Sequence, residues 1–206
     1  METSHPLPCT ELVHAIYKSR CTVRCMLQQR GYTCRQEEET LDTYILLHFS
    51  AATYFNTVLI FDHPTRPSIF VLWPDEEKLR LNTVRAQLEW CDTYQIQHLM
   101  LVYKESITSM TTQFLSNVTD VRIESFSVGQ LQYRVNDHVS VPTHRLLSEQ
   151  EKLALQRLHG KKTEYCRMMS SDAMAKWLGA GPGSMVEVLR RSPEGTVHIT
   201  YRKVGR

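Results

Sequence analysis

The clearest candidate for catalysis in this sequence is Asp62, followed downstream by Glu76-Glu77-Lys78. An Asp and Glu-x-Lys pattern suits a metal-dependent nuclease, in which two carboxylates share Mg²⁺ and the lysine steadies the attacked phosphate. That chemistry needs the glutamate and the lysine on a strand beside the aspartate. Pro74 ends the preceding predicted strand, which places Glu76 in the first turn of a helix, where an acidic residue suits the helix dipole. A Mg-dependent nuclease using Asp62, Glu76 and Lys78 is therefore the alternative hypothesis.

Cysteines are the second candidate, because Cys21 and Cys25 lie four residues apart on a predicted helix and Cys34 follows. Structural zinc needs four ligands, usually as two close pairs, and here there is one pair and no Cys-x-x-Cys. The sequence holds six cysteines but shows no signal-peptide pattern at its start, a combination that favours reduced thiols. We predict no metal site, no cofactor and no disulfide, and we expect a protein that is not secreted.

Three hydroxyl side chains, Thr108, Ser109 and Thr111, follow a predicted strand and open a predicted short helix. Hydroxyls and free N–H groups at a helix start can hold a phosphate without a net positive domain. The competing interpretation is an N-cap without a ligand, in which a hydroxyl satisfies one N–H group of the helix. The sequence alone leaves both interpretations open.

Charge is distributed unevenly along the 206 residues, although the formal net charge is only +2. Residues 1–143 hold 12 Lys and Arg against 16 Asp and Glu, whereas residues 144–206 hold 12 against 6. A free-standing DNA-binding protein usually concentrates basic charge on its binding domain, so any DNA contact by the longer part should be weak and aided by partners. No window approaches the roughly 20 uninterrupted apolar residues of a membrane span, so we expect no membrane contact.

The periodicity of the first part predicts an α/β domain. Apolar spacings of three, four and seven residues predict a helix over 12–27, which Gly31 ends. A second helical pattern, from Leu81 to Cys91, is long enough for a crossover between strands. Runs rich in β-branched and aromatic residues predict strands over 44–49, 58–61, 69–73, 99–103 and 131–135.

The second part begins with a well-marked helix, because Ser148-Glu149-Gln150-Glu151 fits the capping box. Glycine and proline then punctuate the chain into short elements. These are a helix ending at His159 before Gly160, a helix capped by Ser171 or Asp172 and ended by Gly179, and strands over 185–190 and 197–202 joined by the turn 192–195. The predicted fold class is therefore α+β: an N-terminal α/β domain with a mixed sheet and helices, followed by a small α+β domain with a closing β-hairpin.

Three motifs occur in a diagnostic order. The first is Thr22-Val23 with Met26-Leu27 and Arg30-Gly31-Tyr32, at the end of the first helix. The second and most specific is the junction 137–144, Asp-His-Val-Ser-Val-Pro-Thr-His, and the third is the closing segment with Gly183, Arg190, Ser192, Gly195, Tyr201 and Arg202. In these motifs the chain resembles the fifth subunit shared by eukaryotic nuclear RNA polymerases, whose C-terminal portion corresponds to a small component of the archaeal polymerase.

The resemblance implies a non-catalytic subunit of a DNA-directed RNA polymerase in the nucleus, or in the nucleolus if it is dedicated to RNA polymerase I. Residues 1–137 would form a jaw domain beside the downstream duplex DNA, and residues 138–206 an assembly domain that docks on the largest polymerase subunit. Neighbouring polymerase subunits would be further partners, and the DNA contact would be weak and independent of sequence. The resemblance also implies which residues lie close to the DNA, namely Thr108, Ser109 and Thr111. It implies that the following residues lie at the subunit interface: His138, Pro142, His144, Gly183, Arg190, Ser192, Tyr201 and Arg202.

The chain departs from the family pattern at several places. Ser109, Cys166 and Ala173 stand where the family has proline, and Glu187 stands where lysine is usual. The turn of the closing hairpin is also one residue shorter. These departures fall partly at contact elements, so we interpret the chain as a divergent paralogue.

Overall fold

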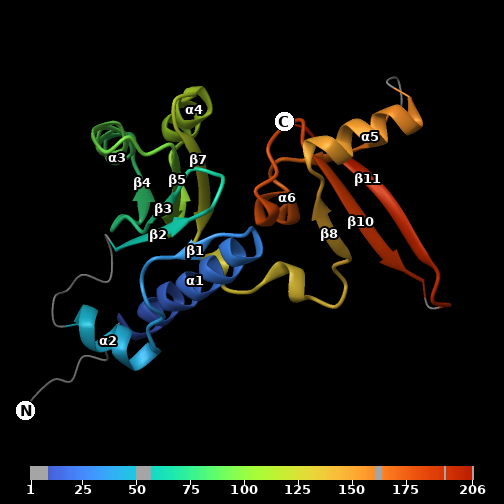
Figure 1. Ribbon diagram of the computed structural model, residues 1–206. Coiled ribbons are helices and arrows are strands. Elements are labelled where there is room, and N and C mark those ends of the chain that lie inside the picture. The colour runs from blue at the N-terminus through green and yellow to red at the C-terminus, as the bar shows by residue number, and fades with distance from the viewer. Residues whose placement is uncertain (1–8, 50–56, 161–163, 193, 206) are drawn as a thin grey trace, which may run out of the picture. The chain divides into compact units, whose positions relative to one another are not determined.

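The computed structural model describes residues 9–49, 57–160, 164–192 and 194–205 (Figure 1). The chain divides into two compact units, Met1–Tyr133 and Arg134–Arg206, a few residues before the boundary predicted at Asp137. Both units mix helices with sheets, which confirms the predicted α+β class. Within the described residues, none of the helices has the length and apolar character that crossing a bilayer requires.

The N-terminal unit is built on a five-stranded mixed sheet with the strand order β1-β2-β3-β5-β7. The first two pairings are antiparallel, while β3 with β5 and β5 with β7 are parallel. The strands are β1 (Thr33–Cys34), β2 (Val58–Asp62), β3 (Ile69–Leu72), β5 (His98–Tyr103) and β7 (Arg122–Ser127). Helix α3 (Leu81–Thr93) connects β3 to β5, and α4 (Ser109–Asn117) connects β5 to β7, so the predicted helical crossover is confirmed.

The two faces of this sheet carry separate apolar layers, because side chains alternate along each strand. Leu99 and Leu101 of β5 pack in one cluster with Val84 and Cys91 of α3. Met100, which lies between them, is also fully buried, and so is Val102, so β5 is covered on both sides. Figure 1 shows α3 and α4 on one side of the sheet and α1 (Cys9–Gln29) on the other.

Helix α1 follows the predicted apolar spacing and buries Ile16, Val23 and Leu27 completely. It ends where predicted: Gly31 has a φ of +88°, and the next N–H group, of Tyr32, donates to the Leu27 carbonyl at 2.9 Å. That left-handed conformation suits glycine, and the return bond satisfies a carbonyl of the last helical turn.

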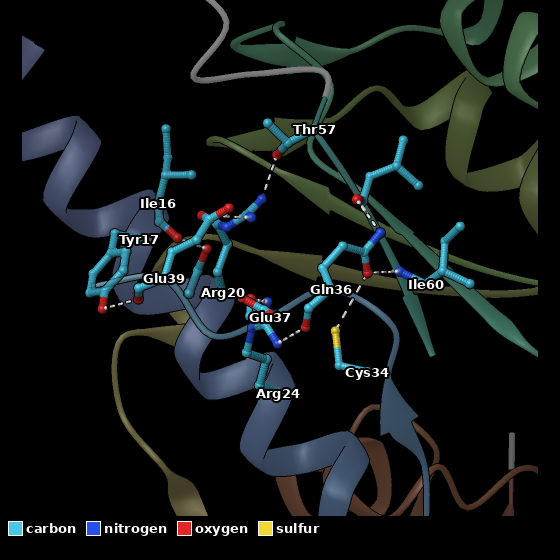
Figure 2. Close-up of polar contacts among 12 residues, drawn as sticks. Ile16, Tyr17, Arg20, Arg24, Cys34, Gln36, Glu37, Glu39, Thr57 and Ile60 are labelled. Atoms are coloured by element: carbon cyan, nitrogen blue, oxygen red, sulfur yellow. Dashed lines mark hydrogen bonds and ion pairs between the residues drawn. The ribbon is translucent and has the colours of Figure 1, made fainter. Parts of the chain in front are cut away.

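Two arginines of α1 hold the segment that follows β1 (Figure 2). Arg24 donates to the carbonyls of Gln36 and Glu37 at 3.0 and 2.7 Å. Arg20, only 6% exposed, donates to Thr57 Oγ1 at 2.8 Å and lies 3.4 Å from the Glu39 carboxylate. Burial lowers the pKa of Arg20, so these partners offset the cost of removing a charge from water.

A second buried polar cluster joins the end of α1 to the sheet. The Glu124 side chain on β7, 12% exposed, accepts from Arg30 Nη1 at 3.0 Å and is paired with His98 Nε2 at 3.0 Å and Arg122 at 3.1 Å. Burial alone would raise the pKa of Glu124, but the charge of Arg30, the hydrogen bond with His98 and the charge of Arg122 outweigh it and lower that pKa to about 2.

Two predicted strands of the N-terminal unit are wrong. Residues 44–49 belong to helix α2 (Leu41–Phe49), which starts where the Thr43 N–H donates to Thr40 Oγ1 at 3.3 Å. A short continuous apolar run does not distinguish a strand from a helix by its period. Residues 131–135 lie in and between two 3₁₀ turns, η1 (Gly129–Leu131) and η2 (Val135–Asp137). The last strand of the sheet is β7 instead, which was not predicted because Arg122 and Glu124 interrupt its apolar pattern.

The C-terminal unit is a four-stranded sheet with two helices. Its strand order is β8-β10-β11-β9, with an antiparallel β10–β11 hairpin and a parallel β11–β9 pair. The strands are β8 (Thr143–Leu146), β9 (Cys166–Met169), β10 (Met185–Arg191) and β11 (Val197–Gly205), and the helices are α5 (Glu149–His159) and α6 (Ala173–Leu178). The capping box of Ser148 with Glu151, the Asp172 N-cap and the stops at Gly160 and Gly179 are all confirmed.

The Glu124 cluster makes stability depend on pH. Because its folded pKa of about 2 lies below the reference value of 4.5, the ionised carboxylate stabilises the fold above pH 4.5, and this contribution is lost as the pH falls towards 2. We expect Glu124→Gln to lower the free energy of unfolding by about 3 kcal/mol at pH 7, with the difference from wild type shrinking below pH 4.5. Urea unfolding at several pH values measures it. Glu105→Gln, at an exposed carboxylate, is the control, and parallel pH curves for wild type and Glu124→Gln would contradict this account.

Candidate functional site

The predicted hydroxyl run opens helix α4, where the three side chains have different environments. Thr108 is the N-cap, and its hydroxyl accepts from the Thr111 N–H at 3.4 Å and bonds to the Thr111 hydroxyl at 2.7 Å. Thr111 is fully buried, so its hydroxyl does not reach an external ligand. Ser109 is exposed. Of the three predicted DNA-proximal residues, Ser109 therefore offers an exposed hydroxyl, and the other two shape the helix start.

Two cations lie beside this helix start: Lys78, which the sequence analysis assigned to the nuclease alternative, and Arg80, which it did not select. The short strands β4 (Lys78–Leu79) and β6 (Ser106–Ile107) pair in parallel, with Lys78 beside Ser106. The Thr108 N–H continues the contact by donating to the Leu79 carbonyl at 3.3 Å. Lys78 and Arg80 are both exposed, and acidic side chains also occur in these loops, including Asp75, which pairs with Lys104 at 2.7 Å. The surface is mixed in charge with local cations, which fits weak attraction of phosphate.

The residues of the nuclease alternative do not meet. Asp62 ends β2 beside the start of β3, where it accepts from Arg35 and Ser68. The hydrogen bonds from Arg35 and Ser68 lower the pKa of Asp62 to about 2. Glu76 lies beyond the opposite end of β3 and accepts from the Arg80 N–H at 3.2 Å and the Thr83 hydroxyl at 2.6 Å.

Glu76 was predicted to lie in the first turn of a helix, and that prediction is wrong. Helix α3 begins at Leu81, and Glu76 precedes it in the loop, where its carboxylate hydrogen-bonds to the helix start. Across the described part of the chain, no group of three or more His, Cys, Asp or Glu side chains is placed to hold a metal ion. The two carboxylates therefore have structural partners at separate ends of a strand.

The predicted interface residues of the C-terminal unit fall into three groups. One face of the sheet carries His144, Arg190 and Arg202. Arg190 alternates along β10 with Val188 and Val186, so these three side chains lie on the same face. His144 is the register partner of Val188, and Arg202 is the register partner of Val186. Val186 and Val188 are fully buried, whereas Arg190 is exposed and Arg202 is partly exposed. This face therefore combines a buried apolar centre with cations at its accessible positions, and we call His144, Arg190 and Arg202 the basic face.

The junction residues border this face. His144 Nδ1 bonds to the Pro142 carbonyl at 2.6 Å, and the Ser140 N–H donates to His138 Nδ1 at 3.2 Å. A shallow groove runs between residues 139–143 and residues 189–191, with Val139 96% exposed at its edge. The predicted His138 and Pro142 thus shape the chain that enters β8.

Tyr201, Gly183 and Ser192 have structural surroundings. Tyr201 lies on the face opposite the basic face, where it packs against the cluster of Leu147, Leu155 and Met185. Burial, and then the nearby Glu187, raise the pKa of Tyr201. Gly183 has a φ of +88°, and the Ser192 N–H donates to the Thr196 carbonyl in the hairpin turn. Pro193, which the sequence analysis placed in that turn, lies outside the described residues.

Glu187, where the family has lysine, has a clear partner. It is opposite Arg145 in the β8–β10 pair, and the Arg145 Nε lies 3.1 Å from its carboxylate. Arg145 also pairs with Glu151 of the capping box. The hydrogen bonds to Glu187 and Glu151 raise the pKa of Arg145, so the three side chains form one surface network across β8, β10 and α5.

The chain combines two α+β units with accessible arginines on its C-terminal sheet, which are features of a protein that binds partners through its surface. Residues 133–204 match the family model of the RNA polymerase Rpb5 C-terminal domain. The chain is 27% identical over 198 residues to the DNA-directed RNA polymerases I, II, and III subunit rpabc1 of Dictyostelium discoideum, covering 93% of this chain and 98% of that protein. It is 24% identical to the subunit RPABC1 of Caenorhabditis elegans, covering 93% and 96%. These similarities confirm the resemblance found in the sequence.

The geometry of the α4 start separates two hydroxyls that are neighbours in sequence. Removing the capping hydroxyl with Thr108→Ala should lower the free energy of unfolding by about 1 kcal/mol, because the Thr111 N–H and hydroxyl lose their partner. Ser109→Ala, at an exposed position, should change it by less than about 0.5 kcal/mol. Urea unfolding followed by circular dichroism measures both, and equal effects of the two substitutions would contradict the N-cap assignment.

Proposed function

We propose that this chain is a non-catalytic structural subunit of a DNA-directed RNA polymerase in the nucleus. The observation that carries the proposal is the similarity to shared polymerase subunits over 93% of the chain. The partners are neighbouring polymerase subunits, above all the largest one. The departures from the family pattern support a divergent paralogue, located in the nucleolus if it is dedicated to RNA polymerase I.

In this proposal, the C-terminal unit (Arg134–Arg206) anchors the chain on the largest subunit. The basic face of this unit presents Arg190 and Arg202 at its accessible positions, which suits a protein surface that supplies carboxylates. Glu187 does not weaken the positive charge of that face, because it lies on the opposite side of the sheet, paired with Arg145. An arginine that becomes buried with a carboxylate at an interface contributes strongly to affinity.

The N-terminal unit (Met1–Tyr133) acts in this proposal as a jaw beside the downstream duplex DNA. The exposed Ser109 and the cations Lys78 and Arg80 lie around the start of α4 and would approach the phosphate backbone. Contacts from hydroxyl, N–H and lysine groups to phosphate position a duplex without reading its bases, so sequence specificity is not expected. The acidic balance of residues 1–143 limits the strength of this contact.

The docking proposal is tested with the tagged full-length chain in cells that make its polymerase. Arg190→Glu combined with Arg202→Glu should reduce the co-purified largest subunit by about tenfold, because it places carboxylates against a surface selected for arginine. The matched control is Arg157→Glu, an exposed arginine on α5 away from the basic face. If the double variant and the control recover the same amount of the largest subunit, this face is not the docking surface.

The jaw proposal is tested in the assembled polymerase with photoreactive downstream DNA. Ser109→Asp should lower crosslinking of this chain to the DNA by about threefold, since it adds a negative charge beside the phosphate backbone. Ser116→Asp introduces the same charge at the other end of α4 and should leave crosslinking near the wild-type level. Equal crosslinking by all three proteins would place the DNA elsewhere.

A further inference from the structure

The C-terminal unit contains a pocket on the side of its sheet opposite the basic face. The pocket has a volume of about 500 Å³ and lies between α5 and the strands β9 and β11. Lys203 points to this side because it alternates along β11 with Arg202 of the basic face. The pocket and the proposed docking face are therefore distinct surfaces of one small unit. The lining residues that concern ligand binding are Lys152, Gln156, Glu164, Tyr165, Arg167 and Lys203.

Two cations stand side by side at the edge of this pocket. Arg167 and Lys203 are register partners in the parallel β9–β11 pair, so their side chains project from adjacent positions on one face of the sheet. Both are exposed, and neither forms an ion pair with a described carboxylate. Like charges at neighbouring positions on a sheet repel each other, and an anion between them would remove that cost.

The opposite wall of the pocket adds a third cation and polar donors. Lys152 and Gln156 lie one turn apart on α5, on the helix side that lines the pocket. Lys152 is held by Glu149 through two long contacts of 3.3 Å. Tyr165 also lines the pocket, and its buried hydroxyl has no hydrogen-bond partner among the described residues. Because that hydroxyl has almost no accessible surface, Tyr165 contributes to the pocket wall without offering its hydroxyl to a ligand.

The net charge of the lining selects the class of anion. Within the lining, Lys152, Arg167 and Lys203 supply three positive charges and Glu164 supplies one negative charge, which leaves +2. Glu149, which pairs with Lys152 from outside the lining, lowers the local balance to +1, so the site retains a net positive charge. A phosphoryl group carries about −1.5 to −2 at pH 7, whereas a single carboxylate carries −1. The planar guanidinium of arginine and the compact ammonium of lysine also both donate hydrogen bonds to phosphoryl oxygens.

We propose that this pocket binds a phosphoryl group, with Arg167 and Lys203 on one side and Lys152 and Gln156 on the other. The volume exceeds that of an isolated phosphate and leaves room for the group that bears it, so a phosphorylated serine or threonine of a polypeptide fits better than the free ion. The site does not depend on the proposed polymerase role, because none of the residues of the basic face lines it.

The proposal is tested by titrating the ¹⁵N-labelled full-length chain at constant ionic strength with a phosphoserine tripeptide, inorganic phosphate or acetate. The phosphoserine tripeptide should give saturable amide shifts at residues 152–156, 164–167 and 203, with a dissociation constant of about 1 mM or lower. Inorganic phosphate should shift the same amides more weakly, and acetate should not saturate. Shifts that do not saturate, or that acetate reproduces, would overturn the proposal.

Matched variants assign the binding to the pocket. Arg167→Gln with Lys203→Gln should weaken binding of the phosphoserine tripeptide about tenfold, and Arg157→Gln, on the same helix as Lys152 but outside the lining, should not. The melting temperature of each variant checks that it folds. If the double variant does not fold, Lys152→Gln gives the same test at a helix surface position. Binding that survives both the double substitution and Lys152→Gln would refute the site.

Discussion

The N-terminal unit depends on charged side chains that α1 carries into its own packing surface. Arg24 holds the backbone between β1 and α2, and Arg20 holds the side chains of Glu39 and Thr57. Arg30 reaches the buried Glu124 on the far strand of the sheet. A buried charge without its partner costs about 3–5 kcal/mol, so each of these arginines fixes its partner in one place. The helix therefore sets the position of the sheet edge and of the segment after β1, and the sheet in turn carries the start of α4.

The C-terminal unit separates its tasks by the two faces of one small sheet. Side chains alternate along β10 and β11, so Arg190 and Arg202 lie on one face and Glu187, Tyr201 and Lys203 on the other. One face carries accessible arginines, to which we assign the proposed docking, while the other carries the α5 core and the pocket beside it. In this way a unit with a single short hairpin can present two surfaces of different chemistry. The surface network of Arg145 with Glu187 and Glu151 also links β8, β10 and α5 where the family has a lysine.

The sequence predicted elements whose signals are local and missed those that tertiary contacts decide. The capping box at Ser148 and the stop at Gly31 were correct because the bonds they make lie within a few residues. Helix α2 was missed because its apolar run fits a buried strand equally well, and it becomes a helix by packing on α1. For the candidate site, the N-cap role of Thr108 was foreseen as an alternative, but Lys78 reaches the α4 start only through the two-residue β4–β6 pair, which leaves no periodic signal in the sequence.

In the proposed function, the chain works as an anchored part of a transcribing enzyme. Affinity purification of the tagged full-length chain from nuclear extract, followed by quantitative mass spectrometry, tests it most directly. We expect the largest subunit of a nuclear RNA polymerase to be recovered in about equal molar amount to the chain, because a stable interface survives purification. Recovery of the chain without polymerase subunits would contradict it.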